Sequence, residues 1–232
     1  MTVRIMRVLA IDTALEACSA AVLDTERGAI AARETLPMQR GHAEALMPLI
    51  ARVMQTARLP FTALDRIAVT VGPGSFTGLR VGVAAARGIA LAAGKPAVGL
   101  TTLSAYAAPY IALDDGRPVV AAIDARHDHV YLQVFGPGGR TLVGPRIASV
   151  ADALRVAASG APRVVGTAAK ILAAAWPPEA QRPITVDPRP APEIDWVARL
   201  GSAAVETSSP PKPFYLRAPD AQPQDASQLA RR

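Results

Sequence analysis

Short apolar runs dominate the first forty residues, and the period of the pattern then changes. These runs predict strands at 7–13, 17–24 and 29–36, and the close spacing of the first two predicts a hairpin. From 42 to 57 apolar residues recur at helical spacing, which predicts an amphipathic helix of about four turns. The chain therefore begins as three strands followed by one long helix.

Strands and helices alternate beyond this helix. An apolar run at 66–72 predicts a buried strand, 75–92 predicts a second long helix, and 96–101 predicts another strand. Strands that alternate with helices at this spacing are typical of a parallel sheet. The first hundred residues thus predict an α/β lobe in which a parallel portion adjoins the hairpin.

A weak internal repeat links the two halves of the chain. The segment "VLAIDT" at 8–13 is echoed by "VAAIDA" at 120–125, and a second apolar strand follows each. The repeat predicts a duplicated plan, with an N-terminal lobe at 1–101 and a C-terminal lobe at 102–217. Further elements are expected as helices at 151–158, 168–175 and 193–206 and a strand at 162–166. Residues 218–232 are polar and without apolar periodicity, so we expect a disordered tail.

The composition is that of a folded protein in a reducing compartment. Half of the 232 residues are hydrophobic, and Cys18 is the single cysteine, so no intrachain disulfide can form. Asp12 ends the first apolar run too early for a signal peptide, and Arg80 and Arg87 interrupt the longest apolar segment. We therefore expect a cytoplasmic protein that does not contact a membrane, with Cys18 as a small core residue.

The net charge of +6 comes almost entirely from arginine. Such a charge permits a nucleic-acid partner, but the sequence contains no run of clustered arginines with interleaved aromatic residues. The arginines are therefore interpreted as part of a solvated surface.

The glycine-rich segment "VGPGSFTGLRVG" lies between a strand and a helix, where many proteins bind phosphate. It fails the Walker pattern, because Gly72 and Gly78 are six rather than five residues apart. Thr77 breaks the dinucleotide-binding pattern, and Pro73 breaks the pattern of a nucleophile elbow. The segment is instead interpreted as a tight turn with Ser75 as the N-cap of the following helix.

Small residues continue along this second helix. They are spaced four, three, three and four apart, which predicts one continuous stripe: Gly78, Gly82, Ala85, Gly88 and Ala92. Each mid-helix glycine costs about 1 kcal/mol relative to alanine, so close approach of another element must compensate. Packing or a partner interface is favoured, with anion binding at the helix N-terminus and catalysis as the alternatives.

Asp12 and Asp124 end the two repeated strands, where a carboxylate commonly holds a metal or activates water. The turn after Asp12 contains no glycine, so its backbone has little room to approach a phosphate, and turn capping is favoured over catalysis. Asp12, Thr13 and Ser75 are kept as weak candidates for nucleotide contact.

The three histidines do not form an obvious metal site. Nothing near His127 and His129 completes a ligand set, so a solvated turn is favoured there. His42 begins the first helix, and the residue one turn later is Leu46, so a helical two-histidine site is missing. We expect no catalytic residue and no metal site, because the chain has the plan of an enzyme without a complete enzyme site.

Four segments resemble the TsaB (YeaZ) family, the non-catalytic partner in bacterial tRNA threonylcarbamoyladenosine biosynthesis. They are "LAIDTALEACSAAVLD" at 9–24, "GPGSFTGLRVGVAAARGIALA" at 72–92, "AAIDARHDHVY" at 121–131 and "PFYLR" at 213–217. The resemblance implies an α/β fold of the actin-like, sugar-kinase-like and Hsp70-like ATPase class. This class has two related, ribonuclease-H-like lobes, of which the second is reduced here.

The resemblance also implies a function. Members dimerise with the transferase TsaD, which modifies adenosine 37 at N6 in tRNAs reading ANN codons, and the ATPase TsaE and the synthase TsaC complete the pathway. The helices at 42–57 and 75–92 would dock on TsaD. The expected interface residues are Leu46, Leu49, Ile50, Val53, Gly78, Gly82 and Ala85. The chain would need no cofactor of its own, although the wider complex uses ATP and Mg²⁺, and it would meet tRNA indirectly and could form a homodimer when alone.

Two rival functions are weighed against this scaffold. A stand-alone kinase or ATPase of the same fold is disfavoured by the glycine-free first turn and the short chain. A protease, which the older description of the family as inactive glycoprotease homologues suggests, is disfavoured because no catalytic dyad or metal set can be assembled.

Overall fold

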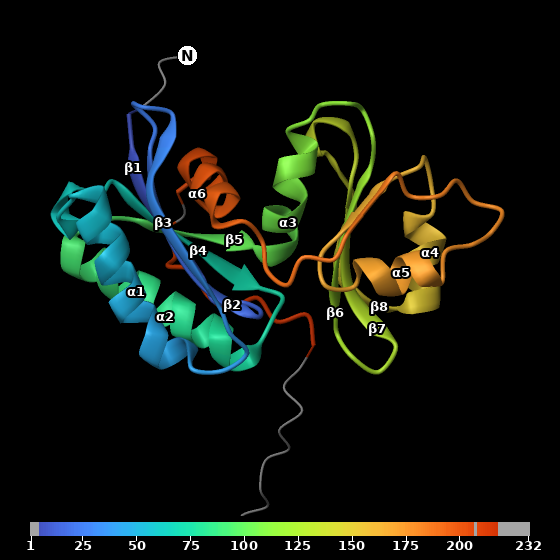
Figure 1. Ribbon diagram of the computed structural model, residues 1–232, viewed down its shortest axis with the longest axis horizontal. Helices are drawn as coiled ribbons and strands as arrows, with labels where there is room; N and C mark the ends of the chain where they lie inside the picture. The colour runs from blue at the N-terminus through green and yellow to red at the C-terminus, as the bar shows by residue number, and fades with distance from the viewer. Residues whose placement is uncertain (1–4, 207, 218–232) are drawn as a thin grey trace, which may run out of the picture.

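The computed structural model describes residues 5–206 and 208–217, so the expected tail at 218–232 lies outside the described residues. These residues form two five-stranded sheets, which stand side by side as two lobes (Figure 1). Helices cover the faces of both sheets, as expected for an α/β protein.

The first sheet has the strand order β3-β2-β1-β4-β5. Its strands are β1 (Arg7–Asp12), β2 (Ala17–Asp24), β3 (Ala29–Pro37), β4 (Arg66–Gly72) and β5 (Ala97–Thr101). The pairs β1–β2 and β2–β3 are antiparallel, whereas β1–β4 and β4–β5 are parallel. The predicted hairpin and the parallel portion beside it are therefore confirmed.

The second sheet repeats this plan. Its strands are β6 (Val119–Asp124), β7 (His129–Phe135), β8 (Thr141–Ser149), β9 (Arg163–Val165) and β10 (Thr185–Asp187). Taken from β8, the order is β8-β7-β6-β9-β10, with two antiparallel pairs followed by two parallel pairs, as in the first sheet. The duplication predicted from "IDT" and "IDA" is confirmed, and the three-residue strands β9 and β10 show that the second lobe is reduced.

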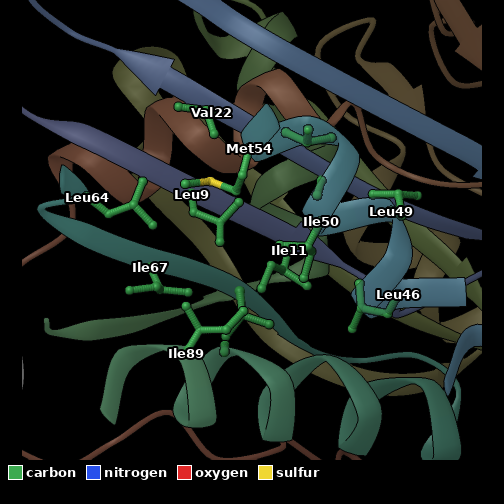
Figure 2. Packing of buried hydrophobic residues seen from close by; sticks show 14 of the residues in the cluster. Leu9, Ile11, Val22, Leu46, Leu49, Ile50, Met54, Leu64, Ile67 and Ile89 are labelled. Atoms are coloured by element: carbon green, nitrogen blue, oxygen red, sulfur yellow. The ribbon is translucent and has the colours of Figure 1, made fainter. Parts of the chain in front are cut away.

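Two long helices cover one face of the first sheet. Helix α1 (His42–Ala57) and helix α2 (Phe76–Ala93) match the predicted ranges closely, and the short 3₁₀ helix η1 (Phe61–Ala63) lies between them in the chain. Figure 2 shows Leu49 and Ile50 of α1 packed with Ile11 of β1 inside this core. The helical spacing in the sequence thus marks the inward face of α1.

Cys18 lies in the same core and is fully buried, as expected for a small core residue. Burial raises the pKa of its thiol to about 11, because the thiolate would have to exist in an apolar environment. The thiol is therefore protonated in the folded protein at neutral pH.

Helix α6 (Ile194–Ala203) covers the opposite face of the first sheet. Its apolar residues pack against Val8 and Ala68, and a Cβ on Gly201 would lie 2.3 Å from the Cβ of Ala68. The predicted C-terminal lobe at 102–217 is therefore wrong at its end, because the chain returns to the first lobe. Periodicity within α6 could not reveal which sheet buries its apolar face.

Arg66 fixes the end of α6 to the first sheet. The arginine is only 5% exposed. Its Nη1 donates to the carbonyl oxygens of Gly201 at 2.8 Å and Ala204 at 2.7 Å. Nη2 pairs with Glu206 at 2.7 Å. The guanidinium thus satisfies carbonyl groups that a helix C-terminus leaves without an internal donor.

Helix α3 (Thr102–Ile111), which the sequence did not predict, lies between the two sheets and packs on β6. Leu103 and Ala107 share a buried cluster with Ile123. Helices α4 (Val150–Ala157) and α5 (Ala169–Ala174) cover the outer face of the second sheet, and η2 (Pro137–Gly139) joins β7 to β8. The second lobe therefore uses α3 on its inner face.

Within the described residues, one helix, α2, is long and apolar enough to span a membrane by length and composition alone. Core helices pass the same test, and Leu79, Val83 and Ala86 of α2 are buried in the first lobe.

Candidate functional site

The β1–β2 turn is inserted against the glycine-rich start of α2. The amide of Ser75 donates to the carbonyl oxygen of Ala14 at 2.7 Å, and Thr13 Oγ1 donates to the carbonyl oxygen of Gly78, also at 2.7 Å. A Cβ at Gly74 would lie 2.3 Å from the oxygen of Ala14, and one at Gly78 only 2.1 Å from the oxygen of Thr13. The turn therefore occupies the space over the N-terminus of α2 where this type of loop would hold a phosphate.

These contacts show that the first part of the small-residue stripe, Gly78 and Gly82, packs inside the lobe. Gly78 packs on Thr13, and a Cβ on Gly82 would lie 2.4 Å from Thr13 Oγ1, so both residues are buried inside the lobe. The expectation that Gly78 and Gly82 form a partner interface is wrong, because the protein's own turn covers them. Ser75 caps α2 as predicted, since the amide of Gly78 donates to Ser75 Oγ at 3.3 Å.

Asp12 is fully buried at the end of β1. Its Oδ1 accepts hydrogen bonds from the amide of Ala14 at 3.2 Å and from Thr70 Oγ1, and its Oδ2 has no hydrogen-bond partner among the described residues. Burial raises the pKa of the carboxyl to about 6, although the bonds from Thr70 and Ala14 and the charge of His42 act in the opposite direction. The predicted turn-capping role is confirmed by the bond from Ala14.

Asp124 has the same role in the second lobe. Its Oδ1 accepts from the amide of Arg126 at 2.8 Å, which is also two residues further along the chain. Asp124 is exposed, whereas Asp12 is buried. The duplicated aspartates therefore cap equivalent turns, and the contribution of Asp12, Thr13 and Ser75 to nucleotide contact stays a prediction.

The histidines make contacts with backbone. His42 Nε2 donates to the carbonyl oxygen of Leu15 at 3.0 Å, and His129 Nδ1 donates to that of His127 at 2.7 Å. His127 has a φ of 52°, within the turn before β7, as expected for a solvated turn. Across residues 5–206 and 208–217, no group of three or more His, Cys, Asp or Glu side chains could hold a metal ion.

A cleft of about 990 Å³ separates the two lobes. Its walls come from the β1–β2 turn, the segment before α1, the start of α2, the end of β6 and the C-terminal segment 213–217. That segment connects the lobes, because the amide of Phe214 donates to Val71 of β4 at 2.7 Å and Arg217 Nη1 donates to the carbonyl oxygen of Ala125 at 3.1 Å. The C-terminal segment therefore forms one side of the cleft.

A second, smaller hollow of about 400 Å³ lies on the outer surface of α1 and α2. We call it the α1–α2 groove, and its residues are Met47, Phe61, Thr62, Ala85, Gly88, Ile89, Ala92 and Ala93. All but Thr62 are apolar or glycine. Met47 is 48% exposed, and a Cβ on Gly88 would meet no atom within 4 Å, so the groove is open to a partner.

Most of the predicted interface residues do not lie in the α1–α2 groove. Four predicted residues of α1 are at most 2% exposed and belong to the core: Leu46, Leu49, Ile50 and Val53. They are wrong as interface residues because they already pack on the sheet. Ala85 does line the groove. Met47 and Gly88 were missed, although Met47 is an apolar residue off the inward stripe of α1, which is the signal that could have identified it.

The structure thus defines a two-lobed α/β protein with duplicated ribonuclease-H-like sheets, in which the β1–β2 turn packs on the glycine-rich start of α2. Residues 35–190 match the family model described as TsaD: tRNA N6-adenosine threonylcarbamoyltransferase. The solved structure of YeaZ from Pseudomonas aeruginosa superimposes with a TM-score of 0.77 at 29% sequence identity, covering 91% of this chain and 100% of that one.

Two relatives extend this likeness in sequence. The tRNA threonylcarbamoyladenosine biosynthesis protein TsaB of Escherichia coli is 40% identical over 126 residues, which are 54% of this chain and 53% of that protein. The match therefore spans about half the length of that relative. An uncharacterized protein of Mycobacterium tuberculosis strain H37Rv is 34% identical over 224 residues, covering 95% of this chain and 96% of its own. The chain belongs to the TsaB/YeaZ family.

Proposed function

We propose that this protein is an accessory subunit in the biosynthesis of threonylcarbamoyladenosine in tRNA, and that it acts by binding a TsaD-type transferase. The name of the Escherichia coli relative supports the pathway. The observation that carries the binding role is the α1–α2 groove, an open apolar surface on the two helices that dominate the first lobe. Exposed apolar surfaces of this kind mark protein interfaces.

The partner we propose has the same fold. A 68-residue segment, 29% of this chain, is 47% identical to the tRNA N6-adenosine threonylcarbamoyltransferase of Erythrobacter litoralis, of which it covers 20%. Two related chains can associate through equivalent surfaces about an approximate two-fold axis. The α1–α2 groove would then face the corresponding helices of the transferase and bury about 1,000 Å² or more in total. A homodimer of the free protein would use the same surface.

We propose that the subunit contributes no bond-making group. The β1–β2 turn fills the phosphate position at α2, and Asp12 is fully buried beneath it. Docking would stabilise the competent state of the transferase, while the TsaE-type ATPase uses ATP and Mg²⁺ and tRNA meets the complex in the cytoplasm. The competing function, a stand-alone ATPase or kinase, is favoured only by the presence of the cleft between the lobes.

Reconstitution tests the proposal. Transferase, TsaE-type ATPase, threonylcarbamoyl-adenylate and tRNA are combined with and without this protein, and the modified nucleoside is measured by mass spectrometry after digestion. We expect modification to depend on the protein. Equal rates in its absence would overturn the proposal. Calorimetric titration of the isolated protein with ATP and Mg²⁺ tests the rival function, because micromolar binding with turnover would support an ATPase instead.

A further inference from the structure

We propose that the mouth of the cleft binds a single-stranded segment of RNA through stacking on Phe76 and Tyr215. This inference rests on the proposed function and adds to it a direct contact with the tRNA substrate. Three side chains carry it, and we call Phe76, Arg80 and Tyr215 the stacking cluster.

The stacking cluster brings together the start of α2 and the C-terminal segment. The ring centroids of Phe76 and Tyr215 lie 5.3 Å apart, with 31° between the ring planes. The guanidinium carbon of Arg80 lies 3.8 Å from the centroid of Phe76, and Arg80 Nε donates to the hydroxyl of Tyr215 at 3.2 Å. Each of the three flat groups therefore contacts the other two.

Phe76 and Tyr215 are exposed aromatic residues in a chain that has few aromatic residues. Aromatic residues make up only 4% of the sequence, and Phe76 and Tyr215 are 40% and 39% exposed. All other aromatic side chains in the described part of the chain are buried or half-buried. Large rings of a chain with so few aromatics would be expected in its cores, so their presence together on the surface indicates a binding function.

Arginine side chains line the same cleft as the two rings of the stacking cluster. Arg40, Arg126 and Arg217 line the cleft together with Phe76 and Tyr215, and Glu16 and Asp124 are the acidic residues of the lining. Counting Arg80 of the stacking cluster, the cleft and its mouth hold four arginines and two carboxylates. None of these four arginines takes part in an ion pair with another described residue. Their charges are therefore available to phosphate groups.

The arrangement fits a strand better than a free nucleotide. The N-terminus of α2, where a single nucleotide would place its phosphates, is filled by the carbonyl oxygens of Thr13 and Ala14. What remains is a pair of exposed rings with separate arginines on both lobes. Successive bases stack on aromatic and guanidinium planes in single-stranded recognition, and the phosphates between them meet basic side chains.

The sequence did not predict this surface. The sequence contains no continuous run of arginines and aromatic residues, so it predicts only a solvated basic surface. Arg40, Arg80 and Arg126 are indeed exposed, and the fold adds a neighbour that the sequence order hides: Arg80 and Tyr215 are 135 residues apart in the chain and in hydrogen-bond contact in the fold.

Fluorescence anisotropy of a fluorescein-labelled RNA stem-loop with a single-stranded loop, titrated with the full chain at low salt, tests the proposal. Tyr215→Ala removes one of the two stacking rings and should raise the Kd about tenfold. Tyr215→Phe keeps the ring and should bind within about twofold of the parent. Arg80→Gln should weaken binding and make its salt dependence shallower.

Arg146→Gln is the matched control, because Arg146 is exposed on β8 outside the cleft lining. Equal Kd values for Tyr215→Ala and the parent would overturn the proposal, and so would equal affinity for a fully paired RNA duplex. Thermal unfolding monitors the fold of each variant. The result is separate from the reconstitution, because RNA binding by the chain alone is measured without the transferase, whereas independence of modification from this protein would reject only the proposed function.

Discussion

Thr13 and Gly78 hold the β1–β2 turn against the first turn of α2. The hydroxyl of Thr13 donates to the carbonyl oxygen of Gly78 at 2.7 Å, and a Cβ at position 78 would lie 2.1 Å from the carbonyl oxygen of Thr13. No real Cβ contact is that short, so position 78 requires glycine or a displaced turn. The glycine that suggested phosphate binding in the sequence therefore serves packing within the lobe.

Two glycines of α2 should respond in opposite ways to alanine. Gly78→Ala should lower the free energy of unfolding by about 1–3 kcal/mol, because the new methyl group has no space beside Thr13. Gly88→Ala should raise it by about 1 kcal/mol, because that Cβ meets open space and alanine is the better helix former. Urea unfolding followed by circular dichroism measures both, and a Gly78→Ala variant as stable as the parent would contradict the packing seen here.

The carboxyl group of Asp12 should make stability depend on pH. Its pKa is raised from 3.8 to about 6, so between these values the folded protein binds more protons than the unfolded chain. The stabilisation by the protonated carboxyl is complete below about pH 4 and is lost as the pH rises through about 6. A shift of this size corresponds to about 3 kcal/mol, since each pKa unit is about 1.4 kcal/mol.

Asp12→Asn tests this dependence, because it removes the charge and retains the carbonyl acceptor for Ala14 and Thr70. The variant should gain stability relative to the parent at pH 7, and this difference should diminish as the pH is lowered toward 4. Thermal melts over this range measure the difference. A difference that is the same at pH 4 and pH 7 would show that the carboxyl does not titrate in this window.

The spacing of apolar residues predicted the strands and helices of the first lobe well, because short apolar strands alternate there with helices that have one clear apolar face. The predicted helix at 42–57 has the same bounds as α1, which begins at His42 and ends at Ala57. Helix α3 was missed because its sequence, "TLSAYAAPYI", is apolar on nearly all sides and contains Pro109. Strand β8 was missed because Gly144 and Pro145 interrupt it, which are residues that ordinarily mark turns.

The surfaces were harder to predict than the elements, because they depend on contacts between distant segments. A helical stripe of apolar residues identifies a face but not what packs on it, so the stripe cannot distinguish a core residue such as Leu49 from an interface residue. The small-residue stripe likewise divides in the fold: Gly82 faces Thr13 inside the lobe, while Ala85 and Gly88 line the groove. Tyr215 joins Arg80 only through the return of the C-terminal segment.

A charge placed in the α1–α2 groove should weaken binding to the transferase. Met47→Glu introduces a carboxylate among apolar residues, and an interface that buries it must leave the charge without a partner. We expect the Kd for the TsaD-type partner, measured by calorimetry, to rise tenfold or more, about the effect of losing one strong interface contact. The fold should be retained, because Met47 is 48% exposed in the free subunit.

Ile171→Glu is the control for this variant. Ile171 lies on α5 of the second lobe and is 40% exposed, so the substitution adds the same charge at a similarly exposed apolar position far from the groove in the fold. It should leave the affinity for the transferase unchanged. If Met47→Glu binds as tightly as the parent and as Ile171→Glu, the groove is not the docking surface. If both variants lose binding equally, the added charge acts without regard to position and the groove again has no special role.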